Sequence, residues 1–220
     1  MPKVTPFQSI RPVPELASRV AALPYDVYNR KEALAEVKRE PLSFLKIDRA
    51  ETQFSDDVDT YDPMVYAKAK ELLDAMIDDG TFITEDVPCY YIYELTMNGR
   101  SQTGIVACSS VDDYQNQLIK KHENTREDKE LDRIRHVDIT DAHTGPIFLV
   151  YRSVQEINEI VEKVKEPEPT YNFVSPDQIS HRAWCISDAQ LINRLQSLFE
   201  QIPCTYIADG HHRCASAVKV

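Results

Sequence analysis

The sequence predicts an α/β fold, with a mixed α+β arrangement as the alternative, on three observations. The second half of the chain alternates short apolar runs with amphipathic segments, as strands alternate with helices. A strong helical pattern occupies residues 63–79, and a strand pair surrounds Asn98-Gly99. The 220 residues suffice for one large domain or two small ones. We place a boundary near residue 112, which gives an N-terminal α+β lobe (1–112) and a C-terminal α/β lobe (113–220).

The first 62 residues mix short elements with loops. We expect extended chain around residues 7–10, a helical turn over 15–21 and a loop at 23–27, where Pro24 keeps Leu23 out of the α region. Good helix formers predict a helix over 30–39, and "SFLKI" at 43–47 has the pattern of a strand. Residues 48–62 hold six acids against one arginine, which indicates a solvated loop.

Residues 63–111 carry the clearest local signals. One apolar face of a helix is formed by Val65, Ala69, Leu72, Leu73 and Met76. Gly80 follows in the position of a helix C-cap. Two apolar runs over 88–111 then flank Asn98-Gly99, a dipeptide that accepts the positive φ angles of a tight turn. The N-terminal lobe is therefore expected to end in a β-hairpin over 88–111.

The second half predicts a series of strands and helices. Residues 120–136 are highly charged and indicate a surface helix preceded by a loop. A buried strand is expected at 146–151, a helix capped by Ser153 after it, and a further strand at 183–186. A helix capped by Ser187 and a strand at 204–208 complete the alternation.

Composition excludes several classes of protein. A net charge of -11 argues against a dedicated DNA- or RNA-binding protein, because such binding needs a concentrated basic face. The five cysteines are far apart and include no Cys-x-x-Cys pair, so we expect reduced thiols and no structural zinc. The N-terminus has no apolar signal region, and no apolar run is long enough to span a bilayer. We therefore expect a cytoplasmic protein that binds neither nucleic acid nor membrane.

The most informative stretch is "CTYIADGHHRCASA", residues 204–217. An apolar run typical of a strand stops at Asp209-Gly210 and leads into a helix that begins near His211. The first turn of a helix has unpaired backbone N–H groups and partial positive charge, which favour an anion. Gly210 lets a ligand approach the backbone, and Arg213 can bind phosphate or carboxylate through two hydrogen bonds. The pattern predicts an anion-binding turn at the carboxyl end of a strand.

Asp209, His211 and His212 are the candidate catalytic residues of this turn. Asp209 could cap the helix, hold Mg²⁺ beside a phosphate or orient a histidine. The two histidines point about 100° apart on a helix, so we do not expect them to ligate one metal together. The structural alternative is an ordinary Asp-Gly turn with histidines at a polar helix start.

A second candidate segment is "KKHENT", residues 120–125. Glu123 could act as a general base, while Lys121, His122 and Thr125 could contact a phosphate. The alternative is a solvated charge run that caps a helix. The basic residues Arg126, Arg133 and Arg135, which follow it, are expected to pair with acids along a surface helix.

Tyr25 and Asp26 belong to a third candidate segment, "LPYDV" at 23–27. Because Pro24 fixes the loop, the two side chains could line the ligand pocket. A structural turn is the alternative, and it is the interpretation we favour.

These motifs together resemble a known family. "ADGHHRCASA" resembles the Gly-x-x-Arg-x-x-Ala type of motif in the ParB/sulfiredoxin superfamily, and its Asp-Gly-His-His-Arg form is similar to that of the archaeal ADP-dependent free serine kinases. With "LPYDV" and "KKHENT", the whole chain resembles the uncharacterised DUF1015 family, often labelled ParB-like. Members of that family continue well past this motif, so the resemblance implies that the sequence belongs to a longer protein.

The resemblance implies a ParB/sulfiredoxin-like site in which Gly210 and Arg213 bind phosphate, with Asp209, His211 and His212 on the catalytic or metal-facing side. Two departures limit the transfer of function. ParB proteins carry a second nucleotide-binding element downstream of this motif, whereas "HENT" lies upstream. ParB also needs a helix-turn-helix region, and no basic segment here could serve.

Three hypotheses about function follow. The leading one is a protein that binds a nucleotide or phosphorylated small molecule; its enzymatic form is phosphoryl transfer to a small metabolite with Mg²⁺ and ADP or ATP. The second is a non-catalytic module that senses a ligand or presents a surface to a partner protein. The third and more distant one is DNA partitioning by analogy with ParB.

Overall fold

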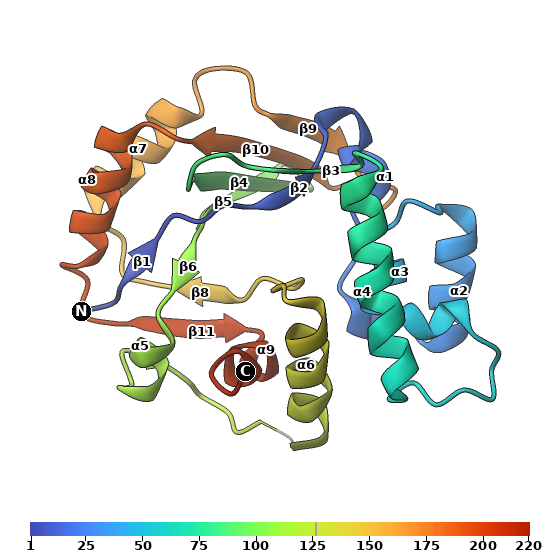
Figure 1. The fold of residues 1–220 in the computed structure, drawn as a ribbon. Coiled ribbons are helices and arrows are strands. Elements are labelled where there is room, and N and C mark those ends of the chain that lie inside the picture. Colours follow the sequence, from blue (N-terminus) through green and yellow to red (C-terminus); the bar gives the residue numbers. More distant parts are fainter. Residues whose placement is uncertain (126) are drawn as a thin grey trace. The chain divides into compact units, whose positions relative to one another are not determined.

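The computed structural model describes residues 1–125 and 127–220, and in this part of the chain it confirms a mixed α/β architecture (Figure 1). The helices, with the short 3-10 turns marked η, are η1 (Pro14–Leu16), α1 (Ala17–Val20), η2 (Tyr25–Val27), α2 (Arg30–Arg39), α3 (Leu45–Asp48), η3 (Ala50–Gln53), α4 (Pro63–Asp78), α5 (Val111–Gln115), α6 (Glu127–Thr140), α7 (Gln155–Val164), α8 (Ala189–Phe199) and α9 (His211–Ala217). The strands are β1 (Val4–Thr5), β2 (Ile10–Pro12), β3 (Phe82–Thr84), β4 (Tyr90–Met97), β5 (Arg100–Val106), β6 (Cys108–Ser109), β7 (Ile119–Lys120), β8 (Phe148–Val150), β9 (Tyr171–Val174), β10 (Ser180–Ile186) and β11 (Thr205–Asp209).

The chain forms two compact units, each assembled from three separate segments. Unit 1 comprises Met1–Ser18, Thr84–His122 and Leu149–Ala208, and unit 2 comprises Arg19–Ile83, Glu123–Phe148 and Asp209–Val220. Residue 112, where the sequence suggested a boundary, lies in α5 within unit 1.

Unit 1 is built on an antiparallel sheet with the strand order β5-β4-β10-β9. The predicted hairpin is confirmed: β4 and β5 pair up to Met97 and Arg100, and Asn98 and Gly99 take positive φ angles of 52° and 77°. Alternate apolar residues of β4 and β10 meet the apolar faces of α7 and α8 in one buried core, which includes Tyr90 and Trp184. The helices therefore cover one face of this sheet.

A smaller sheet of unit 1, with the order β7-β11-β8, leads to the Asp-Gly turn. β11 runs parallel to β7, with Thr205 opposite Ile119. Ile207 of β11 is buried, whereas Tyr206 is exposed, as the alternation of a half-buried strand requires. The strand expected at 204–208 is thus present and points its carboxyl end at the motif.

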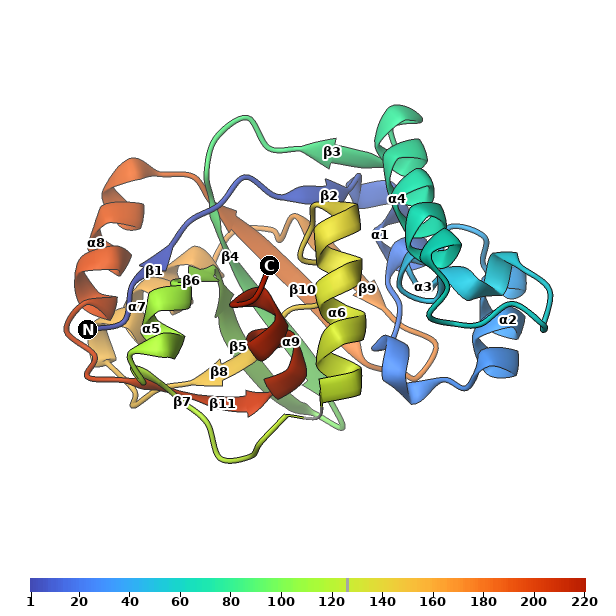
Figure 2. The ribbon, with the colours of Figure 1, turned by 60° about the horizontal axis from the view of Figure 1, so that its bottom comes forward.

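Unit 2 is mainly helical. An Asn29 capping box starts α2, and Asp62 caps α4 through the N–H of Met64. Ala33, Val37 and Leu45 form a small apolar core between α2 and α3. Farther along the chain, α4 and α9 both pack against α6, and Figures 1 and 2 show α9 lying beside α6.

The strand expected at "SFLKI" is wrong, because this segment turns into the single-turn helix α3. Ser43, Leu45 and Ile47 of this segment are buried. Five residues are too few to distinguish a strand from one helical turn by periodicity. Backbone hydrogen bonds within the turn, such as the one from the Arg49 N–H to the Leu45 carbonyl oxygen at 2.8 Å, show that this segment is helical.

Two charged segments are less solvated than their composition suggested. Residues 48–62 form a loop, but it contains η3, where Glu51 is only 1% exposed. In α6 the buried stripe is polar rather than apolar, and Leu131, one of its few apolar residues, is 44% exposed. This stripe consists of Glu130, Arg133, His136 and Thr140.

Smaller differences concern caps and one strand. The helix expected after Ser153 begins at Gln155 with Val154 as its N-cap, and Asp188, rather than Ser187, caps α8. The strand expected to be buried at 146–151 is β8, whose Phe148 and Val150 are both largely exposed.

No disulfide joins the five cysteines of the described chain, in line with the expected thiols. Within residues 1–125 and 127–220, every helix is too short or too polar to cross a membrane.

Candidate functional site

The turn between β11 and α9 requires a glycine. Gly210 is the N-cap of α9 and has φ 88° and ψ 33°, in the left-handed region that side chains with a Cβ rarely adopt. A Cβ at this position would lie 3.2 Å from Nε of Arg213 and 3.2 Å from Cγ2 of Ile147. Backbone conformation and close packing thus both restrict position 210 to glycine.

Arg213 folds back across this turn and is held by protein groups on two sides. Its Nη2 donates to Oδ2 of Asp209 at 2.7 Å, and its Nη1 donates to the carbonyl oxygen of Pro146. Gly145 leaves space for the arginine stem, because a Cβ there would lie 3.0 Å from Cδ of Arg213. The guanidinium group is therefore oriented in advance, while Asp209 remains 71% exposed.

The two histidines of the motif differ in burial, as their spacing on a helix requires. His211 is 5% exposed, and its Nδ1 lies 3.1 Å from Oε1 of Glu123, so the structure brings Glu123 to the motif. An imidazole and a carboxylate are both metal-ligand types. His212 is partly exposed, and with Lys219 and Thr125 it holds the pKa of Glu130 below its usual value.

The remaining residues of "KKHENT" have other surroundings. Lys121 and His122 belong to unit 1, where the ammonium of Lys121 lies 5.2 Å from the ring centre of Tyr114. The hydroxyl of Thr125 donates to Glu130 at 2.7 Å, a contact within unit 2. Arg126, which was expected to pair along the helix, lies outside the described residues.

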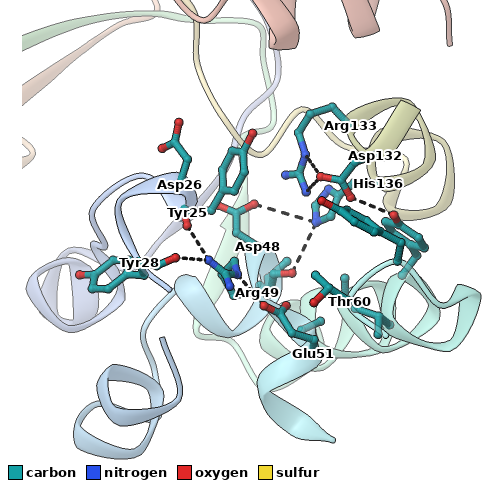
Figure 3. A pocket seen from close by; sticks show the side chains of 16 residues that line it. Tyr25, Asp26, Tyr28, Asp48, Arg49, Glu51, Thr60, Asp132, Arg133 and His136 are labelled. Carbon is teal, nitrogen blue, oxygen red and sulfur yellow. Dashed lines mark hydrogen bonds and ion pairs between the residues drawn. The ribbon is translucent and has the colours of Figure 1, made fainter. Parts of the chain in front are cut away.

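Unit 2 also contains a cavity of about 310 Å³, and Figure 3 shows the side chains that line it. Tyr25 and Asp26, which belong to the short turn η2, both line this cavity. Its polar and aromatic walls consist of Asp26, Asp48, Glu51 and Asp132, Arg49 and Arg133, His136, and Tyr25, Tyr28, Tyr61 and Tyr66. Such a volume suits a small metabolite.

Arg133 and Asp132 form one side of the cavity, on α6. Nε and Nη2 of Arg133 donate to Oδ2 of Asp132 at 3.0 and 2.9 Å, and the hydroxyl of Tyr66 donates to Oδ1 at 2.8 Å. The guanidinium carbon lies 4.2 Å from the ring centre of Tyr25, within range of a cation–π contact. This buried pair is therefore fixed by a phenol on one side and an aromatic face on the other.

Asp48 and His136 face each other across the cavity wall in Figure 3. Oδ1 of Asp48 accepts a hydrogen bond from Thr144 at 2.8 Å and lies 3.9 Å from Nε2 of His136. Burial raises the pKa of Asp48 to about 6, although the nearby Arg133 and Arg213 act in the opposite direction. Burial, assisted by Arg133, lowers the pKa of His136 to about 4, so this imidazole is neutral at pH 7.

Comparison with known families then gives one match. A family model described as "Protein of unknown function (DUF1015)" matches residues 4–220. The chain belongs to the DUF1015 family. No curated protein and no solved structure matches this chain significantly.

In this DUF1015 protein the motif and the cavity are electrostatically connected within unit 2. Arg213 from α9 and Arg133 from α6 both lower the pKa of Asp48, and both oppose the burial that raises the pKa of Tyr25. Two guanidinium groups thus act on the same carboxylate and the same phenol.

Sequence reasoning about this DUF1015 chain did not assign Asp48, Asp132 or His136 to a pocket, and it placed Arg133 on a surface helix. A signal for two of them was present, since Glu130, Arg133, His136 and Thr140 recur at the three- and four-residue spacing of one helix face. Asp48 offered no such signal, because it stands at the start of an acid-rich loop.

Proposed function

We propose that this protein binds a nucleotide or another phosphorylated small molecule in unit 2, at the turn between β11 and α9. The observation that carries the proposal is the position of Arg213, whose guanidinium group lies across the Gly210 turn and is held there by Asp209 and Pro146. A guanidinium group that is oriented in advance recognises phosphate through parallel, charge-assisted hydrogen bonds. The ParB/sulfiredoxin-like pattern of Gly210 and Arg213 supports the same assignment.

The local geometry supports a role for Arg213 in orienting the ligand. The contacts with Asp209 and Pro146 hold its guanidinium in place, so little side-chain entropy remains to be lost when an anion binds. Gly210 at the start of the turn, which has no Cβ, lets the Arg213 side chain lie against its backbone.

The enzymatic form of the proposal is phosphoryl transfer from ADP or ATP to a small metabolite, with Mg²⁺ as the metal. In that reaction Asp209 would hold Mg²⁺, and Glu123, through its contact with His211, would serve as the base. We further propose a cytoplasmic location, on the thiol state of the cysteines and the acidic composition.

Isothermal titration calorimetry with ADP and ATP, each with Mg²⁺, tests the binding step. Arg213→Ala should weaken binding at least about 30-fold, because a charge-assisted bidentate contact is lost. Arg39→Ala is the matched control: Arg39 lies in the same unit but pairs with Glu36 on the surface of α2, and its loss should leave affinity unchanged. Equal affinity of a folded Arg213→Ala variant and the wild type would overturn the proposal.

A turnover assay distinguishes an enzyme from a sensor. The protein is incubated with ADP or ATP, Mg²⁺ and a panel of small hydroxyl and amino compounds, and the nucleotide product is quantified. A catalyst releases product in proportion to time and loses this activity with Glu123→Gln. A sensor binds the nucleotide but releases no product.

A further inference from the structure

The acids of the unit 2 cavity differ in whether a basic side chain contacts them. Of its acids, Glu51 is paired with Arg49 at 2.6 Å and Asp132 with Arg133 at 2.9 Å. Asp48 forms no salt bridge with a lysine or arginine within the described chain, and its closest partners are Thr144 and His136. One largely buried carboxylate therefore remains without a cation in contact.

His136 lies beside Asp48 in the same wall. Its Nε2 lies 3.4 Å from the carbonyl oxygen of Ile47 and 3.9 Å from Oδ1 of Asp48. Both neighbours are acceptors, so the single proton of the neutral ring belongs on Nε2, and Nδ1 carries the lone pair. Among the described residues, this buried Nδ1 has no hydrogen-bond partner, although the side chain is only 3% exposed.

We propose that this cavity binds a small molecule with a protonated amino group, using Asp48 as the counter-ion. An ammonium group carries a positive charge and three N–H donors, which match a carboxylate that no lysine or arginine of the described chain contacts. The tyrosine rings of the cavity suit the neighbouring methylene groups and the cation. This inference is independent of phosphate binding at the turn between β11 and α9.

The size of the cavity limits the ligand to a small metabolite. About 310 Å³ corresponds to roughly ten water-sized groups. Amino acids, amino alcohols and short diamines share the required chemistry and fit this volume.

The charged groups around Asp48 come from several segments. Arg133 and Asp132 face it from α6, Arg213 from α9, and Thr144 from the segment after α6. Arg133 is already paired with Asp132, and Arg213 with Asp209, so neither replaces a ligand cation in contact with Asp48.

NMR titration of the full chain tests the site with defined probes. Ethanolamine, glycine and putrescine represent the amino alcohol, amino acid and diamine classes, and ethylene glycol is the uncharged analogue of ethanolamine. At least one amine should produce saturable shifts in the amide signals of Asp48, Ala50 and Asp132, while ethylene glycol should not. The responding probe identifies the class of ligand.

Two variants locate the counter-ion. Asp48→Asn should weaken binding of the responding amine about 30-fold or more, because it removes the charge and keeps the shape. Asp26→Asn, at an exposed acid of the same cavity, should change it less than about threefold. The proposal is overturned if no amine shifts these signals, if ethylene glycol shifts them as strongly, or if folded Asp48→Asn binds like the wild type. If Asp48→Asn does not fold, the comparison of the amines with ethylene glycol on the wild-type protein still tests the proposal. A loss of nucleotide binding in Arg213→Ala bears only on the phosphate site.

Discussion

Asp48 and His136 lie 3.9 Å apart and respond to burial in opposite directions. Burial raises the pKa of Asp48 to about 6 from its ordinary 3.8, because the carboxylate is more easily accommodated in its neutral form. Burial lowers the pKa of His136 to about 4 from 6.5, for the same reason applied to a cation. Between these values the folded protein favours a neutral pair.

Asp48 should therefore destabilise the folded protein more strongly as pH rises. Between about pH 4 and about pH 6 the folded state holds a proton on Asp48 that the unfolded chain has lost, so stability falls as pH rises. Urea unfolding of Asp48→Asn and wild type should show that the variant gains up to about 3 kcal/mol over the wild type across this range. A constant difference between the two proteins would contradict the burial of this carboxylate.

His136 should show the reverse dependence. Below about pH 6.5 the His136 side chain binds a proton in the unfolded chain but not in the folded protein. The free energy of unfolding therefore decreases as pH falls toward about 4. His136→Gln removes this loss, and its stability relative to wild type should rise as pH falls, by up to about 3 kcal/mol. Urea unfolding over the same pH range measures this difference in stability. The Asp48→Asn data serve as the control, because their pH dependence should have the opposite sign.

At the scale of single elements, the turn before α9 depends on one backbone conformation. Gly210→Ala places a Cβ in the left-handed region and against Arg213 and Ile147, and should cost about 2–3 kcal/mol of unfolding free energy. Gly80→Ala is the matched control in the same unit, with φ 77° and nothing within 4 Å of the added Cβ; strain alone predicts about 1 kcal/mol. Chemical denaturation of both variants gives the comparison, and equal losses would show that the contact with Arg213 has no energetic weight.

Elements with strong local signals were predictable from the sequence. Asn98-Gly99 allows only a tight turn between two apolar runs, and the stripe from Val65 to Met76 fixes α4 with its C-terminal glycine. The strand and helix around Asp209-Gly210 were also predicted, because the change of pattern there is abrupt. Where the local signal was weak, as in "SFLKI", packing around Leu45 and Ile47 decided the conformation.

The cavity was much less predictable than the motif. Polar residues buried on α6 resemble a solvated helix face in the sequence. The pairing of Arg133 with the adjacent Asp132 was expected, but nothing local shows that Arg133 also lies over the ring of Tyr25. Asp48 is separated from Thr144 by 96 positions, and its burial follows from that long-range contact. The role of Gly210 and Arg213 as ligand-binding residues remains a prediction.

At the scale of the whole molecule, the two units are interleaved along the chain. Along the sequence, the three segments of unit 2 alternate with the three segments of unit 1. A sequence pattern identifies a boundary by a change in composition, and such an arrangement produces none, because each unit contains both early and late residues.

Interleaved units make a prediction about which amides lose protection together. Ala215→Leu overfills the contact of α9 with α6, at a cost of about 1–3 kcal/mol, and should speed hydrogen exchange in α4, α6 and α9 while β4 and β10 keep their protection. Ala183→Leu in β10 is the matched control and should affect unit 1 instead. Hydrogen exchange followed by mass spectrometry measures both. Uniform loss of protection over the whole chain in each variant would show that the units unfold as one.

In the protein without a ligand, the carboxylate of Asp209 occupies the position at Arg213 where we propose that phosphate binds. A phosphate that reaches Arg213 must exchange with a carboxylate already bound to it, so its affinity reflects the difference between two guanidinium–anion pairs. Because Asp209 is mostly exposed, water compensates its release, and its return when the ligand leaves restores a neutral pair. Between binding events the arginine therefore presents little net charge to the other anions of a cell, and selectivity begins with this internal competitor.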